Sequence, residues 1–503
     1  MRFSVTAGRV WRDILEEHPP ARLVARRPYY RWLVVGTVCI GAFMGQLDAS
    51  IAQLVLPVLE RDFHHDLGLI SWVAIAYTLT LTVLLPVFGR LADVYGRKTL
   101  YTVGFLLFVL GSGLCGVALD LPFLIGCRVF QAVGAALLQT NSMAIVVSAA
   151  GRHDRGRAIG LQSAAQAVGL SAGPAIGGLL IHTLSWRWVF WINAPIGLLG
   201  AVVGWFVLPQ TKARADDQQF DWGGALLLAP ALTALVLAIN QGHAWGVRSP
   251  AFLCCALAPP LLLPLFIWWE SRRCAPLLDT RLFRQHAFWA GNLAGLLSYA
   301  MLFGVFFLMP FVSERAYHEG ALTAGLRLMV VPAFIGLLSP VSGALYDRIG
   351  PLPLATGGMV LSFTGFVWLA IALQPGQASQ LPLTLALSLF GVGQGLFTSP
   401  NNSSVIAAVP EHGVGQAGGV LNVTRSFGTS VGVAAAAAVL AWRLGAATGR
   451  IGDSMHASPE ALLTAARYVL GMFAIFALIA ATLSWMRPHG ERTRSGADQE
   501  AML

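Results

Sequence analysis

The sequence predicts an all-α membrane protein in which two six-helix bundles and two inserted helices give fourteen transmembrane helices. Three observations lead to this fold class: scarce charge, a series of long apolar runs, and an internal repeat at about half the chain length. Of the 503 residues, 56% are hydrophobic and 11% are charged, whereas soluble proteins are about 25% charged. So little charge argues against a cytoplasmic enzyme, a nucleic-acid-binding protein or a disordered scaffold, although the net charge is +9.

The apolar runs set the number of helices. A helix needs about 20 mostly apolar residues to cross the hydrocarbon core of a bilayer. Twelve spans remain the alternative if the short, proline-rich runs at 222–240 and 251–270 do not cross. The expected spans are 32–58, 69–88, 100–119, 122–148, 157–183, 187–208, 222–240, 251–270, 288–312, 322–343, 351–373, 382–408, 414–441 and 464–486.

The basic residues predict the orientation. Cytoplasmic loops of membrane proteins carry an excess of lysine and arginine. If both termini are cytoplasmic, 23 of the 33 lysines and arginines lie in cytoplasmic segments. We therefore expect a multi-pass protein of the plasma membrane, the inner membrane in a bacterium, and we assign the basic charge to orientation rather than to nucleic-acid binding.

The internal repeat predicts the domain organisation. The stretch GRLADVYG at 89–96 recurs as GALYDRIG at 343–350, and a set of glycines in 156–173 recurs 259 residues later. Two parallel bundles with an unrepeated insert explain both offsets. The expected segments are an N-terminal cytoplasmic segment at 1–31, bundles at 32–208 and 288–486, an insert with two helices at 209–287, and a cytoplasmic tail at 487–503.

The loop sequence GRLADVYGRK at 89–98 predicts a conformational latch. Gly89 and Gly96 permit a tight link between two helices, and Asp93 can pair with a neighbouring arginine or with a helix end across the bundle interface. An ordinary charged loop is the alternative. The latch residues that we expect are Gly89, Asp93, Gly96, Arg97 and Lys98, with Asp347 and Arg348 in the second copy.

The fifth expected span contains a stripe of small residues in GLSAGPAIGG at 169–178. Glycines spaced by four strip one helix face of side chains and allow close helix packing, and proline adds a bend. Packing alone would explain this pattern. The residues of the stripe are Gly169, Gly173, Pro174, Gly177 and Gly178.

Asp48 is the one acidic residue deep within an expected span. Burial disfavours the carboxylate anion, so such a residue can exchange a proton near neutral pH. Asp48 could instead be the structural partner of an arginine, or bind a cationic substrate. Arg128 and Gln131 in the fourth span are the expected partners, since an arginine within a membrane helix needs a cavity or a partner, although Arg128 could also reach the interface.

Further polar residues within the spans are candidates for a substrate cavity. No metal-ligand spacing and no catalytic constellation is present, so we expect no enzyme activity and no cofactor other than the proton as coupling ion. The cavity candidates are Gln53, Gln139, Gln166, Asn422 and Arg425.

These motifs together resemble those of the major facilitator superfamily. The stretch 89–98 is similar to its signature G-x-L-a-D-r-x-G-r-k, with Val94 in place of an arginine. The fifth-span stretch resembles the antiporter motif of the family's drug exporters. QLDASIAQLVLP at 46–57 is similar to the first-helix motif of its fourteen-helix drug:proton antiporters, with Ser50 and Gln53 in place of threonine and asparagine.

The resemblance implies a secondary transporter that works by alternating access. The expected activity is proton-coupled efflux of drugs or other lipophilic compounds, cations among them, with Asp48 protonated in the cycle and Gly173-Pro174 preventing leak. The alternative is a proton-coupled or facilitated transporter of a polar or anionic metabolite. The expected partners are a small-molecule substrate, protons and the lipid bilayer, and not nucleic acid.

Overall fold

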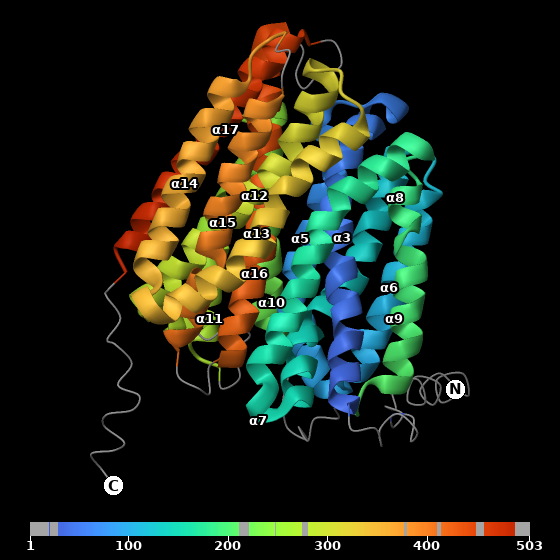
Figure 1. Ribbon diagram of the computed structural model, residues 1–503, viewed down its shortest axis with the longest axis vertical. Coiled ribbons are helices and arrows are strands. Elements are labelled where there is room, and N and C mark those ends of the chain that lie inside the picture. Colours follow the sequence, from blue (N-terminus) through green and yellow to red (C-terminus); the bar gives the residue numbers. More distant parts are fainter. Residues whose placement is uncertain are drawn as a thin grey trace.

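The computed structural model describes residues 20, 29–210, 221–246, 248–273, 280–376, 380–409, 414–448 and 457–487, and every regular element within these ranges is a helix. Helical structure follows from the membrane environment, because only helices or closed barrels satisfy every backbone polar group in lipid. The helices stand roughly side by side along the long axis of the molecule (Figure 1).

The helices fall into an N-terminal set, an inserted pair and a C-terminal set. The N-terminal set comprises α3 (Tyr30–Phe63), α4 (Leu67–Ile70), α5 (Trp72–Tyr95), α6 (Arg97–Gly116), α7 (Leu121–Thr183), α8 (Trp188–Trp191) and α9 (Asn193–Val207). The inserted pair is α10 (Trp222–Trp245) and α11 (Pro250–Glu270). The C-terminal set comprises η1 (Thr280–Arg284), α12 (His286–Phe311), η2 (Val312–Ala316), α13 (Ala321–Ile349), α14 (Pro351–Ala372), α15 (Leu381–Ala407), α16 (Val414–Thr448) and α17 (Pro459–Trp485).

Among the described residues, fourteen segments are long and apolar enough to cross a membrane, which confirms the expected number. The inserted pair supplies two of them, so both of its helices are long and apolar enough to cross, which favours fourteen spans over twelve. The expected break at 149–157 is not a loop, because α7 holds the fourth and fifth spans in one helical element that turns back on itself at the lower end of Figure 1. The expected cytoplasmic segments 1–31 and 487–503 lie almost wholly outside the described residues.

An even number of spans places the start of α3 and the end of α17 on the same side of the membrane. We call this side the terminal end of the protein, and it is the lower end of Figure 1. We call the other side the opposite end, where α3 stops at Phe63 and η2 follows α12.

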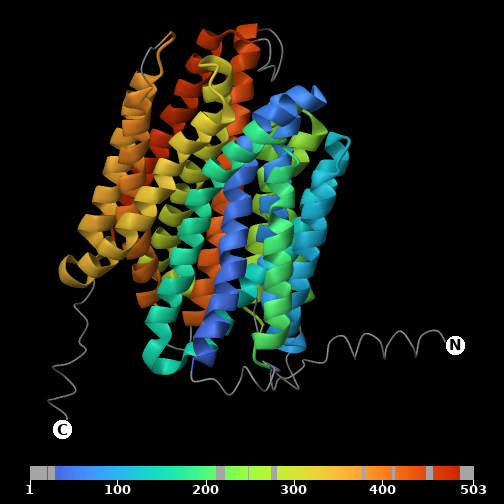
Figure 2. The same cartoon turned by 45° about the vertical axis from the view of Figure 1, so that its right-hand side comes forward.

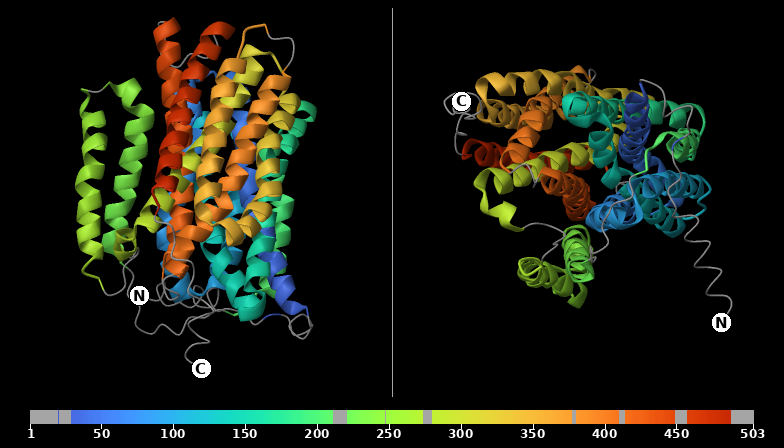
Figure 3. Two further views of the ribbon diagram at one scale, coloured as in Figure 1. Left: turned by 60° about the vertical axis from the view of Figure 1, so that its left-hand side comes forward. Right: turned by 90° about the horizontal axis from the view of Figure 1, so that it is seen from below.

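The inserted hairpin lies on the outside of the molecule, beside one seam between the two bundles (Figure 3). Leu228 and Leu232 of α10 form a small apolar cluster with Phe266 of α11. Val83 of α5 and Phe427 of α16 pack against this cluster. The hairpin therefore contacts both bundles through one helix, while α11 turns most of its surface toward lipid.

The glycine stripe of α7 packs this helix against two neighbours. A Cβ atom added to Gly169 or Gly173 would collide with the backbone or with Ser50 of α3. On another side of the same helix, a Cβ atom added to Gly325 of α13 would collide with the Pro174 carbonyl oxygen. Figure 2 shows α7 running beside α3. The fifth span thus lies in backbone contact with α3 of its own bundle and with α13 of the other bundle.

The other two glycines of the stripe have the same surroundings. A Cβ atom on Gly177 would collide with Ile51 of α3, and one on Gly178 would collide with the backbone of α13 at Ala321. In the C-terminal repeat, Gly428 and Gly432 of α16 approach α12 as closely. The repeat that the sequence shows is therefore also a repeat of close helix packing.

The substitution Gly173→Val should destabilise the protein, because the new side chain must displace Ser50 in a tightly packed contact. Overpacking of this kind costs about 1–3 kcal/mol. Thermal unfolding of the detergent-purified protein measures the effect. The matched control is Gly160→Val in the same helix, where an added Cβ meets no atom within 4 Å. Equal melting temperatures for the two variants would contradict the packing role of Gly173.

Candidate functional site

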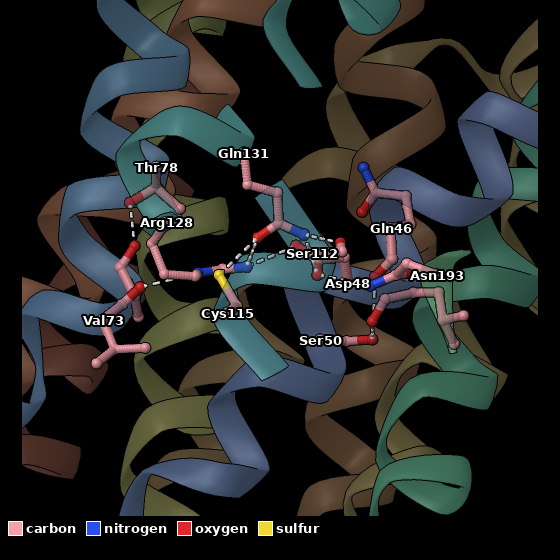
Figure 4. A network of polar contacts seen from close by, with 12 residues as sticks. Gln46, Asp48, Ser50, Val73, Thr78, Ser112, Cys115, Arg128, Gln131 and Asn193 are labelled. Atoms are coloured by element: carbon pink, nitrogen blue, oxygen red, sulfur yellow. Dashed lines mark hydrogen bonds and ion pairs between the residues drawn. The ribbon is translucent and has the colours of Figure 1, made fainter. Parts of the chain in front are cut away.

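Asp48 lies near the middle of α3, and none of its surface is exposed. Its Oδ2 atom accepts a hydrogen bond of 2.9 Å from Arg128 Nη1, and its Oδ1 atom accepts one of 2.9 Å from Gln131 Nε2 (Figure 4). Arg128 and Gln131 lie one turn apart in the first half of α7. The structure thus brings together the three residues that the sequence selected for proton coupling.

The guanidinium of Arg128 is enclosed within the protein and does not extend to the membrane interface. It is 1% exposed, and its Nε atom donates a hydrogen bond of 3.1 Å to the carbonyl oxygen of Val73 in α5. Its centre lies 4.0 Å from the ring centroid of Tyr77. Burying a charge is expensive unless it is paired and hydrogen-bonded, and these contacts supply that compensation.

Two residues of this network were not selected from the sequence. Asn193 Nδ2 donates a hydrogen bond of 3.0 Å to Asp48 Oδ1, and Ser112 Oγ lies 2.6 Å from Gln131 Nε2. Asn193 begins α9, and Ser112 lies in α6. The signal for Asn193 was a polar amide within the otherwise apolar span Trp188–Val207. Asp48 therefore accepts three hydrogen bonds, an arrangement that suits the ionised carboxylate.

A cavity lies between the two bundles, and its empty space, including the part that is open to solvent, is about 710 Å³. Most of its wall comes from α3, α5 and α7, and residues of α12 and α16 complete it. Gln139, Gln166 and Arg425 line it, as the sequence predicts. The wall includes Gln46, Ala49, Tyr77, Thr78, Phe108, Gln139, Ser142, Gln166, Phe303, Arg425, Ser426 and Thr429.

Other predicted cavity residues lie elsewhere. Gln53 is 2% exposed in the part of α3 beyond Asp48 and is not part of the cavity wall. Asn422 lines a smaller adjoining pocket, whose empty space including the part open to solvent is about 320 Å³, and Arg425 lines both spaces. Asp48 itself lies behind the cavity wall, in which its chain neighbour Ala49 and the tyrosine stacked on Arg128 take part.

Ion pairs join the two bundles at the opposite end. Arg61 of α3 lies 2.9 Å from Glu314 of η2, and Arg315 of η2 lies 3.6 Å from Glu60 of α3. Arg315 Nη2 also donates a hydrogen bond of 3.3 Å to the Pro57 carbonyl oxygen. The cavity wall uses residues 41–49 of α3, whereas the ion pairs use Glu60 and Arg61 near the end of this helix, so the ion-pair cluster lies beyond the cavity toward the opposite end.

The predicted latch is described only in part. Gly96 has a φ angle of +93° and joins α5 to α6, and Gly350 has a φ of +81° at the repeated position between α13 and α14. Gly89 does not form the turn as expected, because α5 continues as a helix to Tyr95.

The charged members of the latch are placed as follows. Lys98 is buried and Arg97 is half-buried, and both have interaction partners, while Arg348 is exposed. The side chains of Asp93 and Asp347 lie outside the described part of the structure, so the pairing of this latch stays a prediction.

Fourteen candidate membrane spans among the described residues, a cavity on the seam between two bundles and a buried ion pair beside it are the features of a membrane transporter for small molecules. The chain belongs to the Major Facilitator Superfamily, whose family model matches residues 38–433. This confirms the family that the motifs predict, and it makes the chain a transporter and not an enzyme.

Relatives with different cargoes share this fold. The chain is 33% identical to the riboflavin transporter RibZ of Clostridioides difficile (strain 630), covering 80% of this chain and 87% of the relative. It is 29% identical to the multidrug resistance protein B homolog of Mycobacterium tuberculosis (strain ATCC 25618 / H37Rv), covering 81% and 76%. The crystal structure of a bacterial homolog of the human lysosomal transporter Spinster matches with a TM-score of 0.66 and 14% identity, covering 92% and 97%.

The Asp48–Arg128 pair should show strong energetic coupling. Arg128→Met leaves a buried carboxylate without its cation, and removing one partner of a buried pair costs about 3–5 kcal/mol. The double variant Asp48→Asn/Arg128→Met carries neither charge, so we expect it to be more stable than Arg128→Met alone. Thermal unfolding of the wild type, both single variants and the double variant measures this coupling. Strictly additive losses would contradict it.

Proposed function

We propose that this protein is a proton-coupled antiporter that exports small organic molecules by alternating access. The observation that carries the proposal is the Asp48 carboxylate, which is the one acidic side chain near the middle of a described span and is held by three donors beside the cavity. A single buried acid next to a substrate path is the arrangement expected of a proton relay.

Proton exchange at Asp48 changes the forces between helices. The ionised carboxylate attracts Arg128 and accepts hydrogen bonds from α7 and α9. Protonation removes the negative charge and one acceptor site, while Arg128 stays charged at any physiological pH. The interaction between α3 and α7 is therefore weaker in the protonated state, which favours a rearrangement of the helices.

The cavity wall connects this event to the substrate. Tyr77 lines the cavity on one face and stacks on the Arg128 guanidinium on the other. Gln46 and Ala49, which flank Asp48 in α3, also line the cavity. A bound molecule thus touches the side chains that hold the ion pair, and its binding favours one arrangement of that pair, as coupling between two ligands requires.

The direction of transport follows from the charge distribution. We infer that the terminal end faces the cytoplasm of a plasma membrane, because the arginine-rich segments gather there. The ion pairs Arg61–Glu314 and Glu60–Arg315 then close the outer side. A cavity on the cytoplasmic side of these ion pairs, with an ionised Asp48, is suited to loading a molecule that will leave in exchange for an incoming proton.

A second candidate function is transport of a polar or anionic metabolite. The residues that line the cavity include Arg425 and no acidic side chain. The relative from C. difficile is named a riboflavin transporter, and its cargo by that name is a polar vitamin. The same proton exchange at Asp48 would serve this substrate class.

The decisive variant is Asp48→Asn in proteoliposomes that carry an imposed pH gradient. We expect proton-driven movement of riboflavin, fluorescein or rhodamine 6G, whichever the wild type transports, to fall at least tenfold, since the amide cannot take up the proton. Dye exchange without a gradient should persist, because the cavity wall is unchanged.

Asp62→Asn is the matched control. Asp62 lies in the same helix but at the opposite end, where its Oδ2 atom accepts a hydrogen bond of 2.7 Å from Trp186 Nε1. Asp62→Asn should keep its response to the gradient. Gradient-driven transport by Asp48→Asn at the wild-type rate would refute proton coupling through this residue.

A further inference from the structure

Arg425 of α16 occupies an unusual position in the C-terminal wall of the cavity. It lines both the large cavity and the smaller pocket that adjoins it. Its Nη2 atom is buried and has no hydrogen-bond partner among the described residues. Its guanidinium centre lies 6.0 Å from the ring centroid of Tyr299 of α12, at the outer limit of a cation–π contact.

Two of the other arginines buried within the bundles, Arg128 and Arg327, have acidic partners, whereas the buried Arg487 bonds the Asn401 side chain. Arg128 is paired with Asp48, and Arg327 of α13 is paired with Glu319 through two hydrogen bonds of 2.5 Å. No ion pair of Arg425 occurs among the described residues. A guanidinium in a low-dielectric wall is costly without a counter-charge. The Nη2 atom of Arg425 can therefore donate a hydrogen bond to a ligand that enters the cavity.

The rest of the cavity wall favours a negatively charged ligand. The wall residues include no aspartate or glutamate, and Arg425 is the one charged side chain among them. The nearest deep acid, Asp48, is fully buried behind the wall and accepts bonds from Arg128, Gln131 and Asn193. Its charge is therefore compensated by the protein and is not presented to a cation in the cavity.

The wall also provides surfaces for an apolar body. Phe108 of the N-terminal bundle and Phe303 of the C-terminal bundle line the cavity, together with the ring of Tyr77. Around Arg425, the smaller pocket is lined by Asn402 and Asn422, whose amides can donate to a second oxygen. A planar aromatic part would fit against the rings while an oxyanion reaches Arg425.

We propose that Arg425 is the anion-binding subsite of the transport cavity and that the preferred substrates are amphipathic organic anions, with an aromatic or apolar body and a carboxylate or similar oxyanion. The inference rests on the proposed function in one respect, that this cavity is the substrate path. Arg425 forms charge-assisted hydrogen bonds with the oxyanion, and the proton at Asp48 is handled by the other bundle.

Binding of two dyes of opposite charge to the purified protein in nanodiscs tests this proposal. Fluorescein is an anion and rhodamine 6G is a cation. Because both dyes contain a xanthene ring, their fluorescence anisotropy compares the binding of an anion and a cation with the same ring system. We expect the wild type to bind fluorescein more tightly. Arg425→Gln should weaken fluorescein binding at least tenfold, the loss typical of a hydrogen bond to a charged group, and leave rhodamine 6G within about threefold.

Two further variants complete the experiment. Arg425→Lys keeps the charge and should retain most of the fluorescein affinity. Arg443→Gln, in the same helix but outside the cavity, where Arg443 stacks 3.8 Å from the Tyr468 ring centroid, should bind as the wild type does. A melting curve of each variant verifies that it is folded.

Several outcomes would overturn the anion subsite. They are a wild type that prefers rhodamine 6G or fails to bind fluorescein, or a folded Arg425→Gln variant with unchanged fluorescein affinity. Binding at equilibrium needs no pH gradient. Gradient-driven transport by Asp48→Asn at the wild-type rate, which would refute proton coupling, would therefore leave this result intact, and a failed anion preference would leave proton coupling intact.

Discussion

The buried ion pair between Asp48 and Arg128 is the constraint around which the N-terminal bundle is organised. Two opposite charges with almost no exposure are tolerable only if the remaining hydrogen-bonding capacity is satisfied. The bundle meets this demand with groups from five helices: the acid on α3, the Val73 carbonyl on α5, Ser112 on α6, Gln131 on α7 and Asn193 on α9. The relative positions of these helices are thus tied to one carboxylate, and a proton on that carboxylate affects all of them.

The two bundles repeat each other in packing but not in charge. Gly173 and Gly432 both allow backbone contact with the first helix of their own bundle, and Gly96 and Gly350 make the same left-handed turn between helices. The charged residues do not repeat between the bundles, since the C-terminal bundle places the unpaired Arg425 in the cavity wall. Under the proposed mechanism, the shared scaffold supports the movement, and the unshared residues divide proton binding and substrate binding between the bundles.

Much of this structure is visible in the sequence because membrane burial makes polar residues conspicuous. Fourteen apolar runs predict fourteen spans, and Asp48, Arg128 and Gln131 are selected because charge is costly in an apolar helix. Ser112 and Asn193 give weaker signals, since a hydroxyl or an amide costs less to bury, and hydropathy does not show which side chains meet. The same limit explains Gly89, whose expected turn lies inside α5, and Gln53, which is buried away from the cavity. The position of a polar residue within an apolar run can be read from the sequence. Its hydrogen-bond partners depend on how the helices pack.

The connection from the ion pair to the movement of the bundles runs through α7. This one element carries Arg128 and Gln131 in its first span and Gly173 and Pro174 in its second. Gly173 packs on Ser50, two residues from Asp48, and the Pro174 carbonyl contacts Gly325 of the other bundle. Contacts this close leave no side chains to absorb a displacement, because packed interiors transmit strain. Under the proposed mechanism, a shift of α3 that follows proton exchange at Asp48 would reach the seam between the bundles through a few backbone contacts, because α7 joins the ion pair to the contact with α13.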